Sequence, residues 1–235
     1  MTQPALDTLE RTRMKIVLAT IAINILAVVI FSRLPWSDWR TGLWLNLVDN
    51  LLLIMFAVRY RDPLIAHFMV FGLALGFTEL AADAWLVDVT RTLDYSIGGG
   101  PMIWRSPLWM PFAWEIIAVQ FGYVGLRLWE KWGKKGLLLA GLIGAVNIPF
   151  YEEMALQTKW WEYHNCRMFL HTPYYIIVGE FLIVLCIAAM AVKLRKKNWV
   201  KTIFCGFSAG LSIFACYALA YFTAEMFLKN QSYAF

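Results

Sequence analysis

Two short stretches place a proline close to acidic residues inside runs that are otherwise apolar. MPFAWEII (residues 110–117) carries Pro111 and Glu115, and NIPFYEEM (residues 147–154) carries Pro149 followed by Glu152 and Glu153. Both contain the pattern P-F-x-x-E. In an apolar setting the neutral form of a carboxyl group is favoured because the charged form is desolvated, and crowded carboxyl groups reinforce this preference. A protonated carboxyl group beside a carboxylate is a general acid with a base next to it.

Five more acids lie in apolar runs. Glu79 and Asp83 are four residues apart, which places them on one face of a helix. Tyr217 and Tyr221 share a helical face with a further acid, Glu225. An ionisable residue inside a membrane is costly to place there and is a functional-site hypothesis by default. The complete set is Asp49, Glu79, Asp83, Glu115, Glu152, Glu153, Glu180 and Glu225.

The composition determines which elements must position these acids. Hydrophobic residues make up 60% of the chain and charged residues only 16%, against roughly 25% charged residues in soluble domains. Runs of about 20 mostly apolar residues are long enough to cross a bilayer as helices. The sequence therefore predicts an all-α, polytopic membrane protein in which residues 1–235 form one domain. The seven expected spans are about 15–32, 43–59, 64–86, 108–128, 136–156, 173–193 and 200–226.

Lysine and arginine predict the orientation of this bundle. With the N-terminus inside, fourteen of these residues lie in inner segments and seven in outer segments. The positive-inside rule then places the N-terminus inside and the C-terminus outside. In this orientation all eight acids fall in the outer half of the bundle, and nine of the twelve tryptophans lie on the outer side. We therefore expect a polar chamber on the outer side.

Other elements are expected to shape the chamber. The outer loops at 87–107 and 157–172 are long, and the glycines, prolines and apolar residues of SIGGGPMIWRSP indicate a first loop folded down onto the bundle. Gly72 and Gly76, like Gly206 and Gly210, have the spacing that permits close helix approach, although chance glycines are an equal alternative. A kink at Pro149 would turn the following acids inward.

These observations yield a set of candidate site residues. Glu152 and Glu153 are about 100° apart on a helix, so only one is expected to face the chamber, and the match to Glu115 favours Glu153. The candidate catalytic residues are Glu79, Asp83, Glu115, Glu152 and Glu153. The candidate substrate-binding residues are Asp49, Trp85, Trp114, Tyr151, Glu180, Tyr217 and Tyr221. No metal and no cofactor is predicted.

A buried acid that faces the membrane suits a lipid substrate. Protonation of an isoprenoid double bond needs only a strong acid and a shaped apolar chamber. The resulting carbocation would be stabilised by tryptophan and tyrosine faces and captured by water or by another double bond. The expected partners are an isoprenoid or other lipid substrate and the surrounding membrane lipids.

Several short motifs resemble those of membrane enzymes that modify isoprenoids. The order E79-LAADAW, Y95-SIGGGP, MIWRSP, LWMP-FAW-E115 resembles the layout of carotenoid hydratases. PFYEE is similar to the proline-and-acids motif of heterodimeric-type lycopene cyclases, which, like the membrane terpene cyclases, are small polytopic bundles with essential acids. The resemblance covers about residues 79–182. It implies an isomerase- or lyase-class enzyme with catalytic acids at Glu79, Glu115, Glu152 and Glu153, acting by cyclisation or hydration.

Four alternatives remain open or are disfavoured. A transporter, channel or sensor lined by acids should offer polar access from both sides, whereas the inner halves are apolar, and a purely structural subunit is the plainest alternative. A metal-dependent lipid hydrolase would need a mixed site such as His171, Asp83 and Glu153. A retinal protein needs a lysine in the middle of the last helix, where none occurs. No nucleic-acid partner is expected, because the net charge of +5 follows the membrane orientation.

The expected location follows from the spans. The first apolar run lacks a small-residue cleavage site and is interpreted as a retained helix. The four cysteines show no ligand or disulfide spacing. The sequence predicts a multi-pass integral membrane protein of the cell membrane or, in a eukaryotic cell, of the endoplasmic reticulum.

Overall fold

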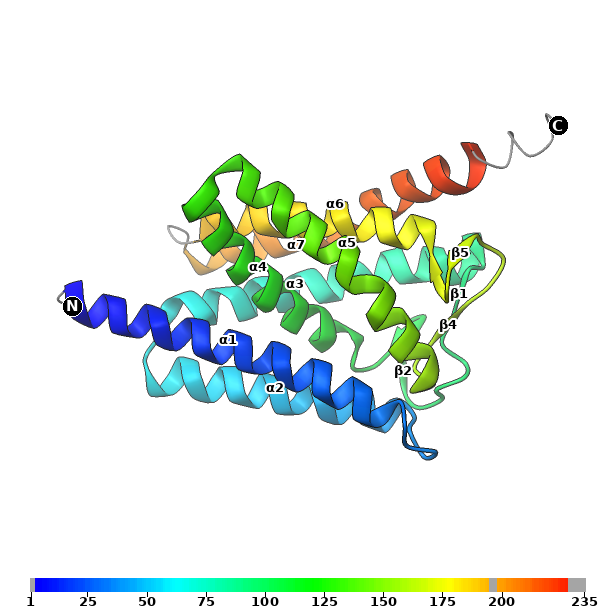
Figure 1. The fold of residues 1–235 in the computed structure, drawn as a ribbon, viewed down its shortest axis with the longest axis horizontal. Helices are drawn as coiled ribbons and strands as arrows, with labels where there is room; N and C mark the ends of the chain where they lie inside the picture. Colours follow the sequence, from blue (N-terminus) through cyan, green and yellow to red (C-terminus); the bar gives the residue numbers. More distant parts are fainter. Residues whose placement is uncertain (1–2, 195–197, 228–235) are drawn as a thin grey trace.

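The computed structural model describes residues 3–194 and 198–227, with side chains described for 8–194 and 198–225. The described part of the chain is mostly helical, at 78%, and it contains seven α-helices (Figure 1). They are α1 (Gln3–Phe31), α2 (Trp39–Arg59), α3 (Pro63–Trp85), α4 (Met110–Trp132), α5 (Lys134–Gln157), α6 (Tyr174–Leu194) and α7 (Trp199–Tyr221). Two π-helical segments, η1 (Leu86–Thr90) and η2 (Phe222–Phe227), extend α3 and α7.

The helices lie close to the expected ranges, with one clear difference at the start. α1 begins at Gln3 rather than near residue 15, because the polar segment before the apolar run is also helical. Polar contacts hold this extension: Arg13 binds the Asp62 carboxylate at 2.6 Å and Glu10 at 2.9 Å. Asp62 also caps α3 by accepting hydrogen bonds from the first backbone amides of that helix.

Six of the helices in the described part of the chain are long and apolar enough to cross a membrane. α4 does not belong to this group, and it carries polar residues such as Glu115, Gln120 and Arg127. Its position explains how a helix of this composition is accommodated. α4 packs against α3, α5 and α6, so protein surrounds much of a helix that lipid would otherwise have to solvate.

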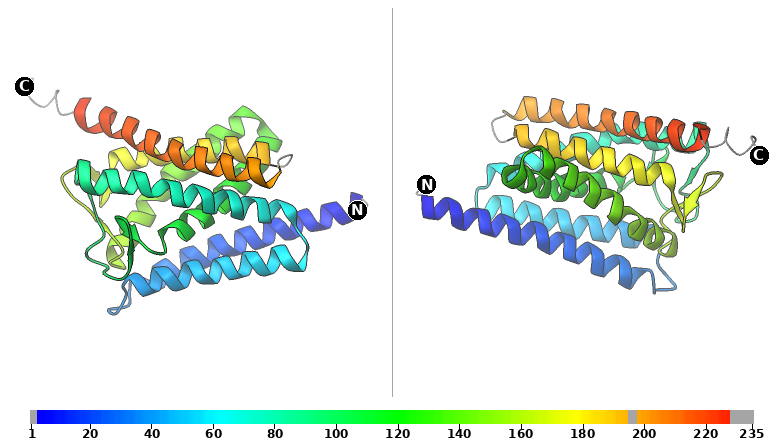
Figure 2. Two further views of the ribbon diagram at one scale, coloured as in Figure 1. Left: turned by 180° about the vertical axis from the view of Figure 1, so that it is seen from behind. Right: turned by 45° about the horizontal axis from the view of Figure 1, so that its top comes forward.

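The glycine pairs mark the closest helix contacts. A Cβ atom at Gly72 would lie 2.7 Å from the carbonyl oxygen of Glu115 on α4. A Cβ atom at Gly210 would lie 2.6 Å from the carbonyl oxygen of Leu75 on α3. The prediction that these glycines permit close approach is therefore confirmed. α3 lies between α4 and α7, while α1 and α2 run side by side along one face of the bundle (Figures 1 and 2).

The two long loops are joined to each other at one end of the bundle. β1 (Leu93–Asp94) pairs antiparallel with β4 (Glu162–Tyr163), with Leu93 opposite Tyr163. Two short hairpins complete the loops: β2 (Met102–Ile103) with β3 (Ser106–Pro107), and β5 (Met168–Phe169) with β6 (Thr172–Pro173). Tyr95 and Ser106 are buried, which confirms that the first loop folds onto the bundle. The start of α1 lies at the opposite end (Figure 1).

Candidate functional site

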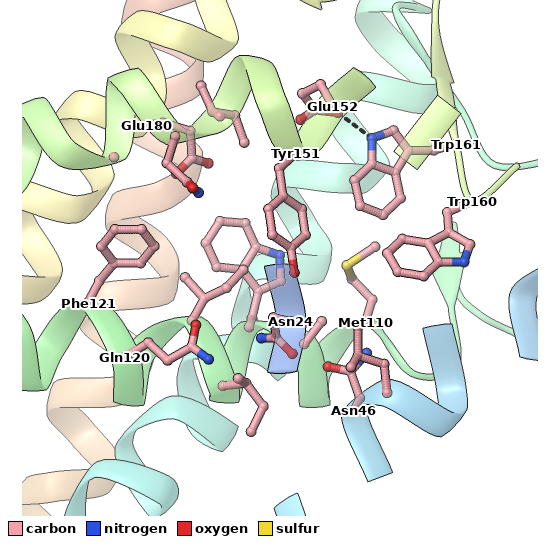
Figure 3. A pocket seen from close by; sticks show the side chains of 18 of the residues that line it. Asn24, Asn46, Met110, Gln120, Phe121, Tyr151, Glu152, Trp160, Trp161 and Glu180 are labelled. Atoms are coloured by element: carbon pink, nitrogen blue, oxygen red, sulfur yellow. Dashed lines mark hydrogen bonds between the residues drawn. The ribbon is translucent and has the colours of Figure 1, made fainter. Parts of the chain in front are cut away.

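A cavity of about 340 Å³ lies under the joined loops. Small-molecule sites commonly measure about 300–1,000 Å³. Its wall comes from all seven α-helices together with the residues around β1 and β4 (Figure 3). Most of the lining is aliphatic or aromatic, with Trp109, Trp114, Trp160 and Trp161 among the aromatic side chains. Polar groups are confined to a few positions in this wall.

Four acids from three helices meet beside this cavity, and we call them the carboxyl cluster: Glu79 and Asp83 of α3, Glu152 of α5 and Glu180 of α6. All four are buried. Glu79 lies close to Asp83 and Glu180, and Glu152 lies close to Glu180 and Asp83. Asp83, Glu152 and Glu180 line the cavity, and Glu79 lies behind them.

Hydrogen-bond donors from the loops hold two of these acids. The Tyr95 hydroxyl and the Ser106 hydroxyl each donate to Asp83 Oδ2 at 2.7 Å. The Trp161 indole donates to Glu152 Oε2 at 2.5 Å, and the Tyr163 hydroxyl donates to Glu152 Oε1 at 3.1 Å. The loop that begins with β1 thus orients the α3 acid, and the loop that contains β4 orients the α5 acid.

The other two acids have different surroundings. Tyr217 of α7 donates from its hydroxyl to Glu180 Oε1 at 2.6 Å. Neither carboxyl oxygen of Glu79 has a hydrogen-bond partner among the described residues, although the side chain lies beside Asp83 and Trp114. Buried polar atoms without partners are rare in folded proteins. A proton shared with Asp83 would satisfy Glu79.

No basic side chain balances the cluster within the described ranges, where every ion pair involves other acids. Four close carboxyl groups repel one another when ionised, and sharing protons relieves that repulsion. The loop tyrosines remain donors beside them. Burial, followed by the charge of Asp83, raises the pKa of Tyr95 well above its usual range. Burial likewise raises the pKa of Tyr163, with Glu152 adding to the effect.

The prediction that Glu153 faces the chamber is wrong. Glu153 accepts hydrogen bonds from His171 Nδ1 at 2.6 Å and from Gln157 at 2.8 Å, and its side chain is 24% exposed. The cavity-lining stripe of α5 has helical spacing: Ile143, Gly144, Asn147, Ile148, Tyr151 and Glu152. Glu153 lies outside this stripe, so Glu152 rather than Glu153 faces the cavity.

Glu115 is buried but does not line the cavity, contrary to expectation. The two P-F-x-x-E patterns differ in structure. Pro111 occupies the first turn of α4, where a proline needs no partner for its missing amide, whereas Pro149 lies inside α5. The acid four residues after the proline nevertheless lies outside the lining in both helices, whereas the residue before it, Trp114 or Glu152, lines the cavity. Gly72 of α3 packs against the backbone of Glu115.

The predicted binding residues divide into two groups. Trp114, Tyr151, Glu180 and Tyr217 line the cavity. Trp85 and Tyr221 instead stack edge to face at 5.5 Å, and Trp85 also meets Phe214 of α7, so both lie outside the cavity wall. Asp49 is buried next to Asn24 and Tyr151 but is not itself part of the lining.

The mixed metal site is not assembled. His171 pairs with Glu153, whereas Asp83 faces Tyr95 and Ser106. Among the described residues, the group with ligand atoms close enough for a metal ion is Asp94, Glu162 and His164, with all ligand atoms within 4.8 Å of one another. It lies on the strand pair of the loops, at partly exposed positions.

Several residues of the site were missed. Asn24, Gln120, Tyr95 and Tyr163 line the cavity but were not candidates. The two amides had a usable signal, because each is a polar residue within an apolar run of α1 or α4. Tyr95 was part of the motif that resembles carotenoid hydratases, but its position at the cavity, like that of Tyr163, depends on the pairing of loops that are far apart in sequence.

Comparisons with known proteins give one match. No curated protein and no solved structure matches the chain. One family model matches residues 80–224, which run from the end of α3 through α7 and include Asp83, Glu152 and Glu180. Since that match covers more than half of the chain, the chain belongs to the family described as "Domain of unknown function (DUF6989)".

Proposed function

We propose that this protein is an integral membrane enzyme that protonates a carbon–carbon double bond of an isoprenoid lipid. The observation that supports this most strongly is the carboxyl cluster, which lies at the edge of a largely apolar cavity and has no basic partner among the described residues. Such an arrangement can hold a neutral carboxylic acid next to a proton-accepting carboxylate.

The proposed reaction balances without any further reagent. Glu152 donates its carboxyl proton to one alkene carbon, so that a C–H bond forms and a carbocation develops on the other carbon. The faces of Trp114 and Trp161 stabilise this cation. A second double bond can attack it, followed by loss of a proton to a carboxylate of the cluster. Alternatively water adds, and its proton goes to that carboxylate.

The path into the cavity fits a substrate that arrives from the membrane. Leu18 and Ile25 of α1 and Ile143 of α5 belong to the cavity lining and are nevertheless 51%, 41% and 38% exposed. The cavity therefore opens sideways through the surface of the bundle between α1 and α5, and we call this opening the side portal. In a membrane protein such an apolar surface faces lipid tails, so an isoprenoid could enter without crossing water.

We further infer that the N-terminus is inside and the C-terminus outside. The support is the asymmetry of basic residues, fourteen against seven. The seven helices place the start of α1 and the end of η2 at opposite ends of the bundle (Figure 1). The joined loops and the carboxyl cluster would then lie on the outer side.

The structure gives less support to a transporter or sensor. Transport requires polar access from both sides, and the cavity lining toward the start of α1 is mostly apolar, as at Leu18, Ile21 and Val124, with Gln120 as a polar exception. The carboxyl cluster instead lies under the joined loops, which cover that end of the cavity. A proton-transfer site for a lipid accounts for both features.

Mass spectrometry of lipids that co-purify with the protein tests the proposal. We expect a polyene or other isoprenoid in extracts of the wild-type protein. Ala113 lines the cavity, and we expect Ala113→Trp to fill the space and lose this lipid while the protein still elutes as a folded species. Bulk phospholipid alone in both extracts would count against an isoprenoid substrate.

A further inference from the structure

A second polar group lines the cavity on the side of α1 and α2. We call it the amide subsite: Asn24 of α1, Asn46 and Asp49 of α2, Gln120 of α4 and Tyr151 of α5. Asn24, Asn46, Gln120 and Tyr151 line the cavity, and Asp49 lies behind Asn24 and Tyr151. None of these residues belongs to the carboxyl cluster.

Some of the polar atoms in this subsite form hydrogen bonds, and others have no partner. The Asn46 amide donates to the Gly42 carbonyl oxygen at 2.8 Å, and the Gln120 amide donates to the Thr20 hydroxyl at 3.2 Å. Asn24 Oδ1 and both carboxyl oxygens of Asp49 have no partner with good hydrogen-bond geometry in the described part of the chain, and the Asn24 side chain lies beside Asp49 as a weakly placed donor. Asn24 is 8% exposed and Asp49 is 1% exposed. Leaving a buried polar group unsatisfied is costly, so these three acceptors indicate a missing donor.

The chemistry of the missing donor can be narrowed. Asn24 offers an oxygen acceptor at the cavity wall, with Asp49 behind it, while the hydroxyl of Tyr151 can donate or accept. An alcohol matches this combination, because its hydroxyl donates one hydrogen bond and accepts others. A carbonyl or ether group would only accept, and would leave the acceptors of the subsite unpaired.

The direction of the side chains separates this subsite from the acids. Tyr151 and Glu152 are neighbours on α5, yet their side chains diverge (Figure 3). The Tyr151 hydroxyl ends on the side of the cavity where Asn24 lies, whereas Glu152 binds the indole of Trp161. One molecule in the cavity can therefore contact the amide subsite with one end and the carboxyl cluster with another part.

We propose that the amide subsite binds the hydroxyl group of an isoprenoid alcohol and thereby fixes which double bond meets the carboxyl cluster. The isoprenoid part of this inference rests on the proposed function, while the hydroxyl part rests on the unpartnered oxygens alone. Asn24, Asp49 and Tyr151 are positioning residues for the hydroxyl end. Glu152 contacts the reacting part of the molecule.

Ligand binding to the purified protein in detergent tests this subsite, with quenching of tryptophan fluorescence as the readout. The probes are farnesol, farnesyl methyl ether and farnesene, which differ in the hydroxyl group. For the wild-type protein we expect farnesol to bind about tenfold more tightly than the other two, because a lost hydrogen bond to a buried acceptor is worth about that ratio. Equal affinities for the three probes would overturn the proposal.

Single-residue variants test whether the preference for farnesol arises at the amide subsite. Asn24→Leu, Asp49→Asn and Tyr151→Phe should each reduce the preference for farnesol to about twofold or less. Asn50→Ala is the matched control, since Asn50 lies next to Asp49 on α2 and donates to the Asn46 carbonyl oxygen outside the cavity lining. It should keep the wild-type preference. A preference that persists in all three subsite variants would overturn the proposal, and the conservative Tyr151→Phe covers the case in which another variant fails to fold.

Two further arms separate this inference from the proposed function. Glu152→Gln should retain the preference for farnesol, because the amide subsite is intact in that variant. If the farnesyl probes do not bind, decanol is compared with decyl methyl ether. A preference for decanol that depends on Asn24 and Asp49 would support the hydroxyl subsite and count against an isoprenoid substrate. Failure of decanol as well would overturn the subsite.

Discussion

Ser106 of the first long loop holds Asp83 in position, and loss of its hydroxyl should lower the stability of the protein. The Ser106 hydroxyl donates to Asp83 at 2.7 Å, and both residues are buried. Ser106→Ala removes that donor and leaves the acid with Tyr95 as its remaining donor in the described structure. We expect a loss of about 1–3 kcal/mol in the free energy of unfolding, seen as a lower midpoint of thermal unfolding in detergent.

The control for this variant lies in the same loop. Ser96 is exposed, so Ser96→Ala should leave the unfolding midpoint close to that of the wild-type protein. If the two alanine variants unfold at the same temperature as the wild-type protein, the loop does not anchor Asp83 as described.

At the scale of helices, the side portal between α1 and α5 should control access to the cavity. Ile143 of α5 lines the cavity at its exposed edge, so a larger side chain there would narrow the opening. We expect Ile143→Trp to lower kcat/KM for a membrane-borne isoprenoid by about tenfold or more, with little change in the unfolding midpoint. Turnover in reconstituted vesicles measures this effect.

Val146 provides the comparison on the same helix. It is 78% exposed and lies outside the cavity lining. Val146→Trp therefore adds the same bulk to the surface of α5 without reaching the portal, and it should turn over substrate like the wild-type protein. Equal turnover by both tryptophan variants would show that substrate does not enter between α1 and α5.

The helices show what the sequence could and could not predict. Apolar runs of membrane-spanning length indicated the positions of six helices, because lipid imposes that length on any helix that crosses it, while α4 also lies close to its expected range although it is less apolar. The rotation of each helix was harder to infer. The shared pattern after Pro111 and Pro149 suggested equivalent acids, and Glu115 and Glu153 are equivalent in that both lie outside the cavity lining. The residue one position earlier, Trp114 or Glu152, lines the cavity, and Glu153 meets His171.

The site as a whole was predictable only in part. An excess of acids toward one end of the bundle correctly included Asp83, Glu152 and Glu180, because charges in apolar runs are conspicuous. Trp161 and Tyr163 act on Glu152 only because β4 pairs with β1, and no local pattern reports that pairing. Asn24 and Gln120 carry no charge, so they are less conspicuous in an apolar run than the acids are.

At the scale of the whole molecule, the orientation in the membrane is open to a direct test. The first long loop and the start of α5 lie at opposite ends of the bundle (Figure 1), and each carries an exposed residue, Ser96 in the loop and Lys134 in the helix. We expect Ser96→Cys to react with a membrane-impermeant maleimide on intact cells, and Lys134→Cys to react only after the membrane is opened. Labelling above the wild-type level is measured on the purified protein. The reverse pattern would invert the proposed orientation.

The central claim, that Glu152 delivers a proton to carbon, is tested most directly by deuterium incorporation. Membranes that contain the protein and its isoprenoid substrate are incubated in heavy water, and deuterium bound to carbon in the lipid is measured by mass spectrometry. We predict incorporation by the wild-type protein and by Glu153→Gln. For Glu152→Gln we predict a fall of about a hundredfold or more, the usual range for loss of a general acid. Incorporation at the wild-type level by Glu152→Gln would contradict the account.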